Sequence, residues 1–311
     1  MKQFEFFKYH GIGNDLVLVD LTAGGVPVTS AEAVELCDRN FGVGADGVLT
    51  LLPSRKAAFR MHIRNSDGSV AEMCGNGLRC AAKYAYDHGR VVVFLGDDET
   101  NGIAAAAGFQ VKRGTRLSGF AVETGRGVLH CVIEAAADGI ANSVWVNMGA
   151  PILERSAIPM TGTGRFLGRE VRAAGKVFTG SAIGMGNPHL VLFAGDDMEQ
   201  AMKYGPILER SPLFPRKTNV EFARVVSESE LSVVVWERGC GITKACGTGA
   251  CATVVAHAMA GHVPFGREVR VVLPGGVLGV SVPADLHAVY MRGPAVEVFR
   301  GWAGEQGRRR A

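Results

Sequence analysis

The sequence has no strong excess of charge of one sign. Its 311 residues include 33 Lys and Arg against 30 Asp and Glu, which gives a formal net charge of +3. Part of this small excess comes from three arginines at positions 308–310. Proteins that bind nucleic acid usually gather basic residues on one face or along one helix, so this balance argues against a nucleic-acid partner.

The sequence also lacks long apolar segments. No run approaches the ~18 consecutive apolar residues that a membrane-spanning helix needs. The stretch from Met1 to His10 contains no apolar core of the kind found in a secretory signal peptide. We therefore expect no membrane partner and a cytoplasmic location, where thiols stay reduced.

Closely spaced cysteine pairs are absent as well. Structural zinc sites typically use Cys-x2-Cys spacing, so we expect no metal, and a structural disulfide is not expected in a reducing compartment.

The hydrophobic fraction is 47% and the charged fraction 20%, as in ordinary globular proteins. The 42 glycines follow no triplet period and indicate turns and close backbone approaches. The chain has seven cysteines: Cys37, Cys74, Cys80, Cys131, Cys240, Cys246 and Cys251.

Two of these cysteines belong to an internal repeat. The segment that runs Cys-Gly-Asn-Gly from Cys74 recurs as Cys-Gly-Thr-Gly from Cys246. A Gly-x-Gly-Asn motif that ends at Asn14 recurs with its end at Asn187, at almost the same sequence offset. Such self-similarity indicates a duplicated structural unit. We infer two similar halves, residues 1–146 and 147–293, and expect residues 294–311 to return to the first half.

Each half combines strands with an apolar helix. We expect helices over Leu78–His88 and Ala250–Gly261, both buried, and over Ala31–Asn40 with Ser30 as the N-cap. The alanine run Ala104–Gly108 predicts no element. Runs of β-branched and aromatic residues predict the remaining elements as strands. The predicted strands are Val17–Asp20, Phe59–Arg64, Val91–Leu95, Val128–Ile133, Val144–Asn147, Leu190–Phe193, Val220–Val226, Leu231–Glu237 and Val269–Leu273.

These elements predict an α+β fold. It would have two pseudo-symmetric domains, each a mixed, mostly antiparallel sheet or barrel wrapped around a central apolar helix, with the active site in the cleft between them. Segments 96–118 and 154–180 match no clear pattern, and we expect variable loops or hairpins there.

A cysteine at the start of a helix has unusual chemistry. The first helical N–H groups and the helix dipole favour a thiolate, and the glycines that follow allow a carboxylate to approach the same N–H groups. Two such cysteines could act as base and acid on opposite faces of one carbon, which would invert a stereocentre without a cofactor. The alternatives are a thiol redox protein that uses Cys74 and Cys246 as a dithiol, and a non-catalytic ligand-binding module. We expect Cys37, Cys80, Cys131 and Cys251 to be core residues and leave Cys240 open.

Eight motifs in fixed order make the sequence resemble a known family, the diaminopimelate epimerases, over the span from Phe6 to about Phe299. These are cofactor-independent amino-acid epimerases of lysine and peptidoglycan precursor synthesis. The motifs are His10-Gly-x-Gly-Asn14-Asp, Phe41-Gly-Val-Gly-Ala-Asp46, Asn65-x-Asp67-Gly68-Ser69, Cys74-Gly-Asn-Gly-x-Arg79-Cys80, Gly186-Asn187-Pro188-His189, Thr218-Asn219-Val220, Glu237-Arg238-Gly239 and Ala245-Cys246-Gly-Thr-Gly-Ala250.

The resemblance implies roles for individual residues. It makes Cys74 and Cys246 the catalytic pair, with no cofactor, and makes His189 and Glu237 the residues that tune them. Arg238 would pair with the distal carboxylate of the substrate, and Glu237 would contact its distal amino-acid end. The backbone at four helix-start positions would hold the carboxylate at the reacting centre, and four asparagines would supply polar contacts. These substrate-binding residues are Gly75, Asn76, Gly247, Thr248, Asn14, Asn65, Asn187 and Asn219.

Three positions depart from the family pattern, and the substrate has alternatives. Gly47 stands where many members have Gln, Ile242 stands where Glu is common, and Cys240 is an additional thiol. The resemblance implies conversion of LL-diaminopimelate to meso-diaminopimelate, a small-molecule amino-acid substrate, by a homodimer. Racemisation of proline, hydroxyproline or histidine on the same two-cysteine scaffold is the nearest alternative.

Overall fold

The computed structural model describes residues 3–71, 73–111 and 113–304, which divide into two compact units. Unit 1 comprises the chain up to Thr100, then Gly114–Val144 and the chain from Pro294 onward. Unit 2 comprises Asn101–Arg113 and Trp145–Gly293. Residues 305–311, the end of the segment expected to return to the first half, lie outside the described residues.

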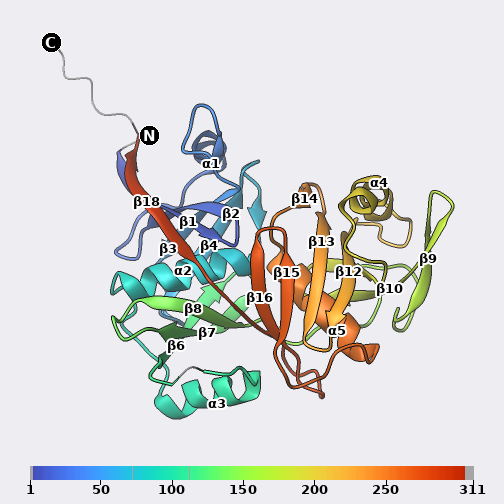
Figure 1. Cartoon of the computed structure of the whole chain (residues 1–311). Coiled ribbons are helices and arrows are strands. Elements are labelled where there is room, and N and C mark those ends of the chain that lie inside the picture. Colours follow the sequence, from blue (N-terminus) through green and yellow to red (C-terminus); the bar gives the residue numbers. More distant parts are fainter. Residues whose placement is uncertain (1–2, 72, 112, 305–311) are drawn as a thin grey trace. The chain divides into compact units, whose positions relative to one another are not determined.

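Unit 1 is a mixed sheet with one long helix packed against it (Figure 1). Strands β1 and β2 form an antiparallel hairpin, β3 pairs parallel with β2, β4 antiparallel with β3, β6 parallel with β4 and β7 antiparallel with β6. The late strand β18 pairs antiparallel with β1, and the short β5 with β4. The bounds are β1 Phe4–Gly11, β2 Asn14–Asp20, α1 Ser30–Cys37, β3 Gly47–Leu52, β4 Phe59–Asn65, β5 Val70–Ala71, α2 Gly75–Asp87, β6 Arg116–Thr124, β7 Gly127–Ala135 and β18 Val296–Ala303.

Unit 2 repeats this order. The hairpin β10–β11 is antiparallel, β12 pairs parallel with β11, β13 antiparallel with β12, β15 parallel with β13 and β16 antiparallel with β15. Strand β9 pairs with β10, β14 with β13 and β17 with β16, all antiparallel. The bounds are β9 Arg169–Ala173, β10 Lys176–Gly184, β11 Pro188–Leu192, α4 Met198–Glu209, β12 Asn219–Ser227, β13 Glu230–Glu237, β14 Gly241–Thr243, α5 Gly247–Met259, β15 Val269–Leu273, β16 Gly276–Ser281 and β17 Tyr290–Gly293.

This matching strand order confirms the predicted α+β fold with a duplicated, mostly antiparallel unit. Two further elements, α3 (Asp97–Ala107) and β8 (Ala141–Asn147), have residues in both units. Asn14 is the first residue of β2 and Asn187 directly precedes β11, so both asparagines lie where a hairpin turn meets the next strand. In each unit the helix that starts at a Cys-Gly-x-Gly segment is 13 residues long.

The two 13-residue helices form the centre of their units. Every residue of α5 from Gly247 to Ala258 is buried, and α5 contacts seven strands of unit 2, from β10 to β17. The residues of α2 from Gly75 to Ala85 are likewise buried, including Arg79 at 0% exposure. A helix that is buried on all sides needs an apolar surface all round, which the alanine and valine content of α5 supplies. The buried, apolar helices predicted from the sequence are therefore confirmed.

The helix boundaries differ from the predicted ones in an informative way. Both α2 and α5 begin three residues earlier than predicted, because the cysteine sulfur caps the first turn and stabilises glycine-rich segments as helix. The N-cap of α1 is Thr29 and not Ser30. The Thr29 hydroxyl accepts from the Glu32 N–H at 3.3 Å, and the Glu32 carboxylate accepts from the Thr29 N–H at 2.9 Å, which is a capping box.

Several other sequence-based expectations were wrong. Val91–Leu95 is not a strand, and Val92 and Val93 are 82% and 65% exposed, so this β-branched run buries no continuous face. The alanine run at 104–107 belongs to helix α3, which begins with three acidic residues that suit a helix N-terminus. The segment 154–180, in contrast, contains the β9–β10 hairpin turn, which agrees with the loops or hairpins expected there. Strands β1, β3, β5, β6, β14, β16, β17 and β18 were not predicted. No helix among residues 3–71, 73–111 and 113–304 has the length and apolar character to cross a membrane.

The last turn of α5 carries a buried histidine that should make stability depend on pH. Burial, and then the nearby His262, lower the pKa of His257 to about 4. Its ordinary pKa in an unfolded chain is about 6.5, so the neutral form stabilises the fold above pH 6.5, and this contribution is lost as pH falls toward 4. The difference corresponds to at most about 3 kcal/mol.

We expect His257→Phe to remove this part of the pH dependence. Urea denaturation at pH 7.5 and pH 4.5 should show a larger loss of unfolding free energy in the wild type than in the variant. Equal losses in the two proteins would contradict the prediction.

Candidate active site

Cys74 is the N-cap residue of α2. Its backbone is extended, with φ −140° and ψ 111°, and its Sγ accepts a hydrogen bond from the Gly77 N–H at 3.3 Å. The sulfur thus takes the place that a serine or aspartate oxygen usually has at a helix start. The thiol lies at the positive end of the helix dipole, which favours its ionised form.

Cys246 has the same position at the start of α5. Its φ and ψ are −126° and 105°, and its Sγ accepts from the Gly249 N–H at 3.3 Å. A Cβ at Gly249 would lie 2.9 Å from Glu221 Oε1 and 3.2 Å from Cys246 Sγ, so a larger residue would require the buried Glu221 carboxylate to shift. The structure therefore places both predicted catalytic cysteines in equivalent capping positions within their own units.

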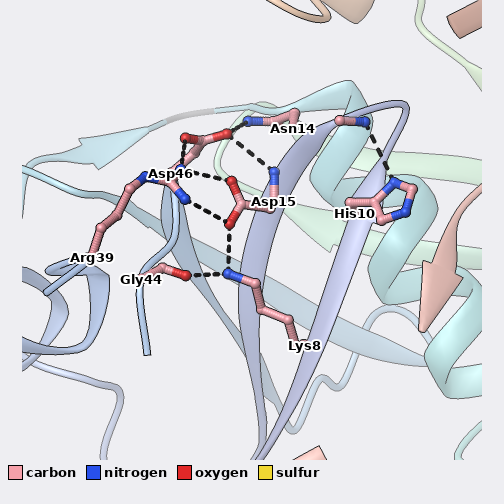
Figure 2. Close-up of polar contacts among 8 residues, drawn as sticks. Lys8, His10, Asn14, Asp15, Arg39, Gly44 and Asp46 are labelled. Carbon is pink, nitrogen blue, oxygen red and sulfur yellow. Dashed lines mark hydrogen bonds and ion pairs between the residues drawn. The ribbon is translucent and has the colours of Figure 1, made fainter. Parts of the chain in front are cut away.

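In unit 1, Asn14 is the polar residue that contacts Cys74. Cys74 Sγ donates to Asn14 Oδ1 at 3.8 Å, and Asn76 Nδ2 donates to the same oxygen at 3.4 Å. The other end of the amide, Asn14 Nδ2, donates to Asp46 Oδ2 at 2.8 Å (Figure 2). Arg79, buried in α2, donates to Asn76 Oδ1 at 2.9 Å. The predicted residues Asn14 and Asn76 are thus brought together at the Cys74 sulfur.

Asn65 is held differently. It is the last residue of β4, and its Nδ2 donates to Ser69 Oγ at 2.9 Å within the exposed turn that follows. Its cross-strand neighbour in β3 is Gly47. A Cβ at Gly47 would lie 2.5 Å from the carbonyl oxygen of Arg64, so a larger residue would require this pair of strands to shift. Glycine at this departure from the family pattern therefore has a steric reason.

In unit 2, a chain of hydrogen bonds leads from a buried carboxylate to Thr248. His189 Nδ1 is hydrogen-bonded to Glu221 Oε1 at 2.7 Å, and both side chains are 0% exposed. His189 Nε2 donates to Asn187 Oδ1 at 2.8 Å, and Asn187 Nδ2 donates to Thr248 Oγ1 at 3.3 Å. Thr248 Oγ1 lies 3.5 Å from Cys246 Sγ. The predicted residues Asn187, His189 and Thr248 thus form one connected group at the second cysteine.

Asn219 and Arg238 form a second group in unit 2. Asn219 is buried, and its Nδ2 donates to the Pro188 carbonyl at 2.9 Å while its Oδ1 accepts from the Arg238 N–H at 2.9 Å. The Arg238 side chain is exposed and donates to the Arg216 carbonyl at 3.4 Å. Asn219 therefore fixes the backbone from which the guanidinium extends.

The thiol of Cys246 is strongly influenced by its surroundings. Burial raises its pKa well above the ordinary range, and the carboxylates of Glu237 and Glu221 raise it further, while the Thr248 hydroxyl and the Gly249 N–H oppose the rise. Glu237 accepts from Thr243 Oγ1 at 2.5 Å, and burial raises its own pKa as well. Glu237 is therefore placed to influence the thiol.

Four of the remaining five cysteines are core residues, as predicted from the sequence, and the fifth is exposed. Cys37, Cys80, Cys131 and Cys251 are buried, and burial raises the pKa of the Cys80 and Cys131 thiols to about 12, so these two thiolates are disfavoured. Cys240 is exposed in the turn between β13 and β14. Ile242, the other departure, packs beside the core of unit 2.

Two residues next to the cysteines were missed by sequence reasoning. Glu221 interrupts the apolar run of β12, and a single acidic residue in such a run is a signal that it has a buried partner. Asp46 lies in a loop that was quoted only as part of a motif. Its contact with Asn14 depends on the parallel pairing of β2 and β3, which the sequence does not reveal.

A family model described as "Diaminopimelate epimerase" matches residues 6–96 and 181–298. A protein named diaminopimelate epimerase from Desulforudis audaxviator is 46% identical over 301 residues, which is 96% of this chain and 98% of that protein. The protein of the same name from Pelotomaculum thermopropionicum is 45% identical over 95% of this chain and 97% of its own. The chain belongs to the diaminopimelate epimerase family. It is therefore an isomerase of the epimerase class.

Solved structures with low identity share the fold of this diaminopimelate epimerase family member. A hydroxyproline epimerase from Agrobacterium vitis superposes with a TM-score of 0.67 at 14% identity, covering 97% of this chain and 91% of its own. A phenazine biosynthesis protein of the PhzF family from Bacillus anthracis superposes with a TM-score of 0.63 at 15% identity, covering 98% and 100%. At such low identity these likenesses concern the fold alone.

The surroundings of Cys246 predict opposite effects for two substitutions. Glu237→Gln removes a carboxylate that raises the pKa of the thiol, so iodoacetamide should alkylate Cys246 about threefold to tenfold faster at a fixed pH. Thr248→Val removes a hydrogen bond that opposes the rise, so alkylation should slow by a similar factor, about threefold to tenfold.

Peptide mapping by mass spectrometry would follow Cys246 separately from the other thiols, with Cys80 as an internal control. Effects of the same sign in the two variants would show that the thiol is not controlled in this way.

Proposed function

We propose that the protein interconverts LL-diaminopimelate and meso-diaminopimelate through a two-thiol mechanism, without a cofactor. The supporting observation is the pair of equivalent cysteine N-caps, Cys74 on α2 and Cys246 on α5. The names of the relatives, diaminopimelate epimerase, support the substrate. The proposal requires the half-sites of the two units to act on one substrate molecule.

The reaction is a proton exchange at the α-carbon. One cysteine, as thiolate, takes the α-proton, so that the C–H bond breaks and its electron pair stays on the carbon next to the carboxylate. The other cysteine, as thiol, then donates a proton to the opposite face of that carbon. The stereocentre is inverted, and the two sulfurs have exchanged protonation states, so the reverse reaction uses the same groups in exchanged roles.

The helix N-termini would hold the reacting carboxylate. Negative charge grows on this carboxylate as the α-proton leaves, and backbone N–H groups at a helix start stabilise such charge. We assign this role to Gly75, Asn76, Gly247 and Thr248. Because the N–H groups of Gly77 and Gly249 already donate to the cysteine sulfurs, each helix start would bind both a sulfur and a carboxylate.

The rest of the substrate would be recognised by polar side chains from both units. We assign the distal carboxylate to Arg238, whose exposed guanidinium can make a bidentate contact, and the distal ammonium end to Glu237. Asn14, Asn65, Asn187 and Asn219 would supply further hydrogen bonds. His189 and Glu237 would adjust the protonation of the thiols.

We further infer that the protein acts in the cytoplasm as a homodimer. A mechanism that needs two reduced thiols fits a reducing compartment. Residues 1–146 with 294–311, and residues 147–293, would form the two domains of each protomer.

The mechanism predicts that each cysteine is indispensable. Cys74→Ala and Cys246→Ala should each lower epimerisation by about a thousandfold or more, the scale of general acid–base catalysis. Cys240→Ser, which changes an exposed thiol, should retain activity. The measurement is the incubation of reduced protein with LL-diaminopimelate in D2O, following deuterium at the α-carbon together with the meso product.

Wild-type turnover in either alanine variant would contradict the two-thiol mechanism. Turnover of proline, hydroxyproline or histidine, with none of diaminopimelate, would contradict the substrate and leave the mechanism standing.

A further inference from the structure

A network of charged side chains in unit 1 surrounds the asparagine that contacts Cys74 (Figure 2). Arg39 Nη2 lies 2.8 Å from Asp15 Oδ1 and 2.8 Å from Asp46 Oδ1, so one guanidinium joins two carboxylates. Lys8, which is buried, bonds Asp15 Oδ2 at 2.6 Å and also the Gly44 carbonyl. The contacts with Arg39 and Lys8 lower the pKa of Asp15 to about 2, against the opposing effect of burial.

This network fixes the orientation of the Asp46 carboxylate. Its Oδ1 accepts from Arg39, and its Oδ2 accepts from Asn14 Nδ2 at 2.8 Å and from the Asp15 N–H at 3.1 Å. The backbone N–H of Asp46 donates to the Asp15 carbonyl at 2.8 Å. Both carboxylate oxygens therefore have partners, and the one that faces Asn14 can only accept a hydrogen bond.

The two ends of the Asn14 amide are chemically different, so Asp46 selects which end faces which way. The nitrogen can only donate and the oxygen can only accept. A reversed amide would set the oxygen of Asn14 against the Asp46 carboxylate, two acceptors in contact. With the nitrogen at Asp46, the oxygen faces Asn76 Nδ2 at 3.4 Å and Cys74 Sγ at 3.8 Å.

We propose that Asp46 is a positioning residue that, by holding the Asn14 amide in this orientation, stabilises the protonated form of Cys74. The inference rests on the proposed function, because it gives the orientation a role in the proton exchange. A carbonyl oxygen can accept from the thiol S–H but repels a thiolate. The Gly77 N–H, at 3.3 Å from the same sulfur, acts in the opposite sense. Cys74 thus has one contact that favours each protonation state.

Unit 2 shows that the hydrogen-bonding partner of the asparagine, and not the repeated fold, decides the orientation of its amide. Asn187 ends the second Gly-x-Gly-Asn motif and is the counterpart of Asn14 in the repeat. There the oxygen accepts from His189 Nε2, and the nitrogen faces Thr248 at the helix start. An acceptor next to Asn14 and a donor next to Asn187 therefore turn the two amides in opposite senses relative to their helices.

The charged groups around Asp46 and Asn14 come from several helices and strands. Lys8 on β1, Asp15 on β2 and Arg39 after α1 surround Asp46, and Arg79 on α2 holds Asn76. Loss of the Asp46 charge alone would also favour a thiolate at Cys74. The test must therefore separate the charge of Asp46 from its hold on Asn14.

The test is the rate at which iodoacetamide alkylates Cys74 in the full-length reduced protein at fixed pH, followed on the Cys74 peptide by mass spectrometry. Asp46→Asn replaces the acceptor that fixes the Asn14 nitrogen, so the Asn14 oxygen is held less firmly beside the sulfur, and we expect alkylation up to about fivefold faster, the factor for one hydrogen bond. Asp46→Glu, which keeps an acceptor, should return the rate toward the wild type. Asp138→Asn, which removes an exposed carboxylate from the β7–β8 turn, should leave it unchanged.

A double-mutant comparison separates the two explanations. In an Asn14→Ala background, Asp46→Asn should produce a clearly smaller increase, because only the effect of the lost charge remains. An equal increase in both backgrounds would show an effect of charge alone and overturn the proposal, and so would an unchanged rate in the single variant. If Asp46→Asn does not fold, as judged by thermal melting, Asp46→Ser should give the same increase. Because alkylation needs no turnover, a protein inactive on diaminopimelate would contradict the proposed function without affecting this result.

Discussion

The hydrogen bond from a backbone N–H to a cysteine sulfur at the start of a buried helix is the constraint on which both half-sites depend. The N–H groups of Gly77 and Gly249 each donate to a sulfur at 3.3 Å. This geometry requires a small residue at the third helical position, a strand that delivers the cysteine with extended backbone, and a helix that can be buried on every side. The sheets of both units supply those conditions with the same order of strands.

The duplicated scaffold supports two different chemical surroundings. Cys74 is partly exposed and faces the oxygen of Asn14, whereas Cys246 is buried beside Thr248 and near two acidic side chains. The proposed two-thiol reaction needs each sulfur to pass through both protonation states. The helix start favours the thiolate in each unit. The Asn14 oxygen opposes it at Cys74, and burial together with the carboxylates of Glu237 and Glu221 opposes it at Cys246.

Much of this arrangement could be predicted from the sequence because it depends on repeated local patterns. The recurrence of the Cys74 segment at Cys246, and the apolar character of Ala250–Gly261, were enough to predict two equivalent buried helices near the cysteines and a duplicated fold. The contacts that distinguish the half-sites were not predictable. Glu221 meets His189, and Asp46 meets Asn14, only because β12 pairs parallel with β11 and β3 with β2, and the sequence does not reveal which strands become neighbours.

The contact between the buried side chains of His189 and Glu221 affects the groups that surround the Cys246 sulfur. Both ring nitrogens of His189 have a hydrogen-bond partner, Glu221 on one side and Asn187 on the other. A buried polar side chain is costly unless it is hydrogen-bonded, and here both ring nitrogens of the buried His189 are bonded. The amide of Asn187 then has its oxygen committed to the ring, which leaves its nitrogen for Thr248 Oγ1. Because that oxygen already accepts, the Thr248 hydroxyl proton is available to Cys246, so a carboxylate with no direct bond to the sulfur helps to hold a donor beside it.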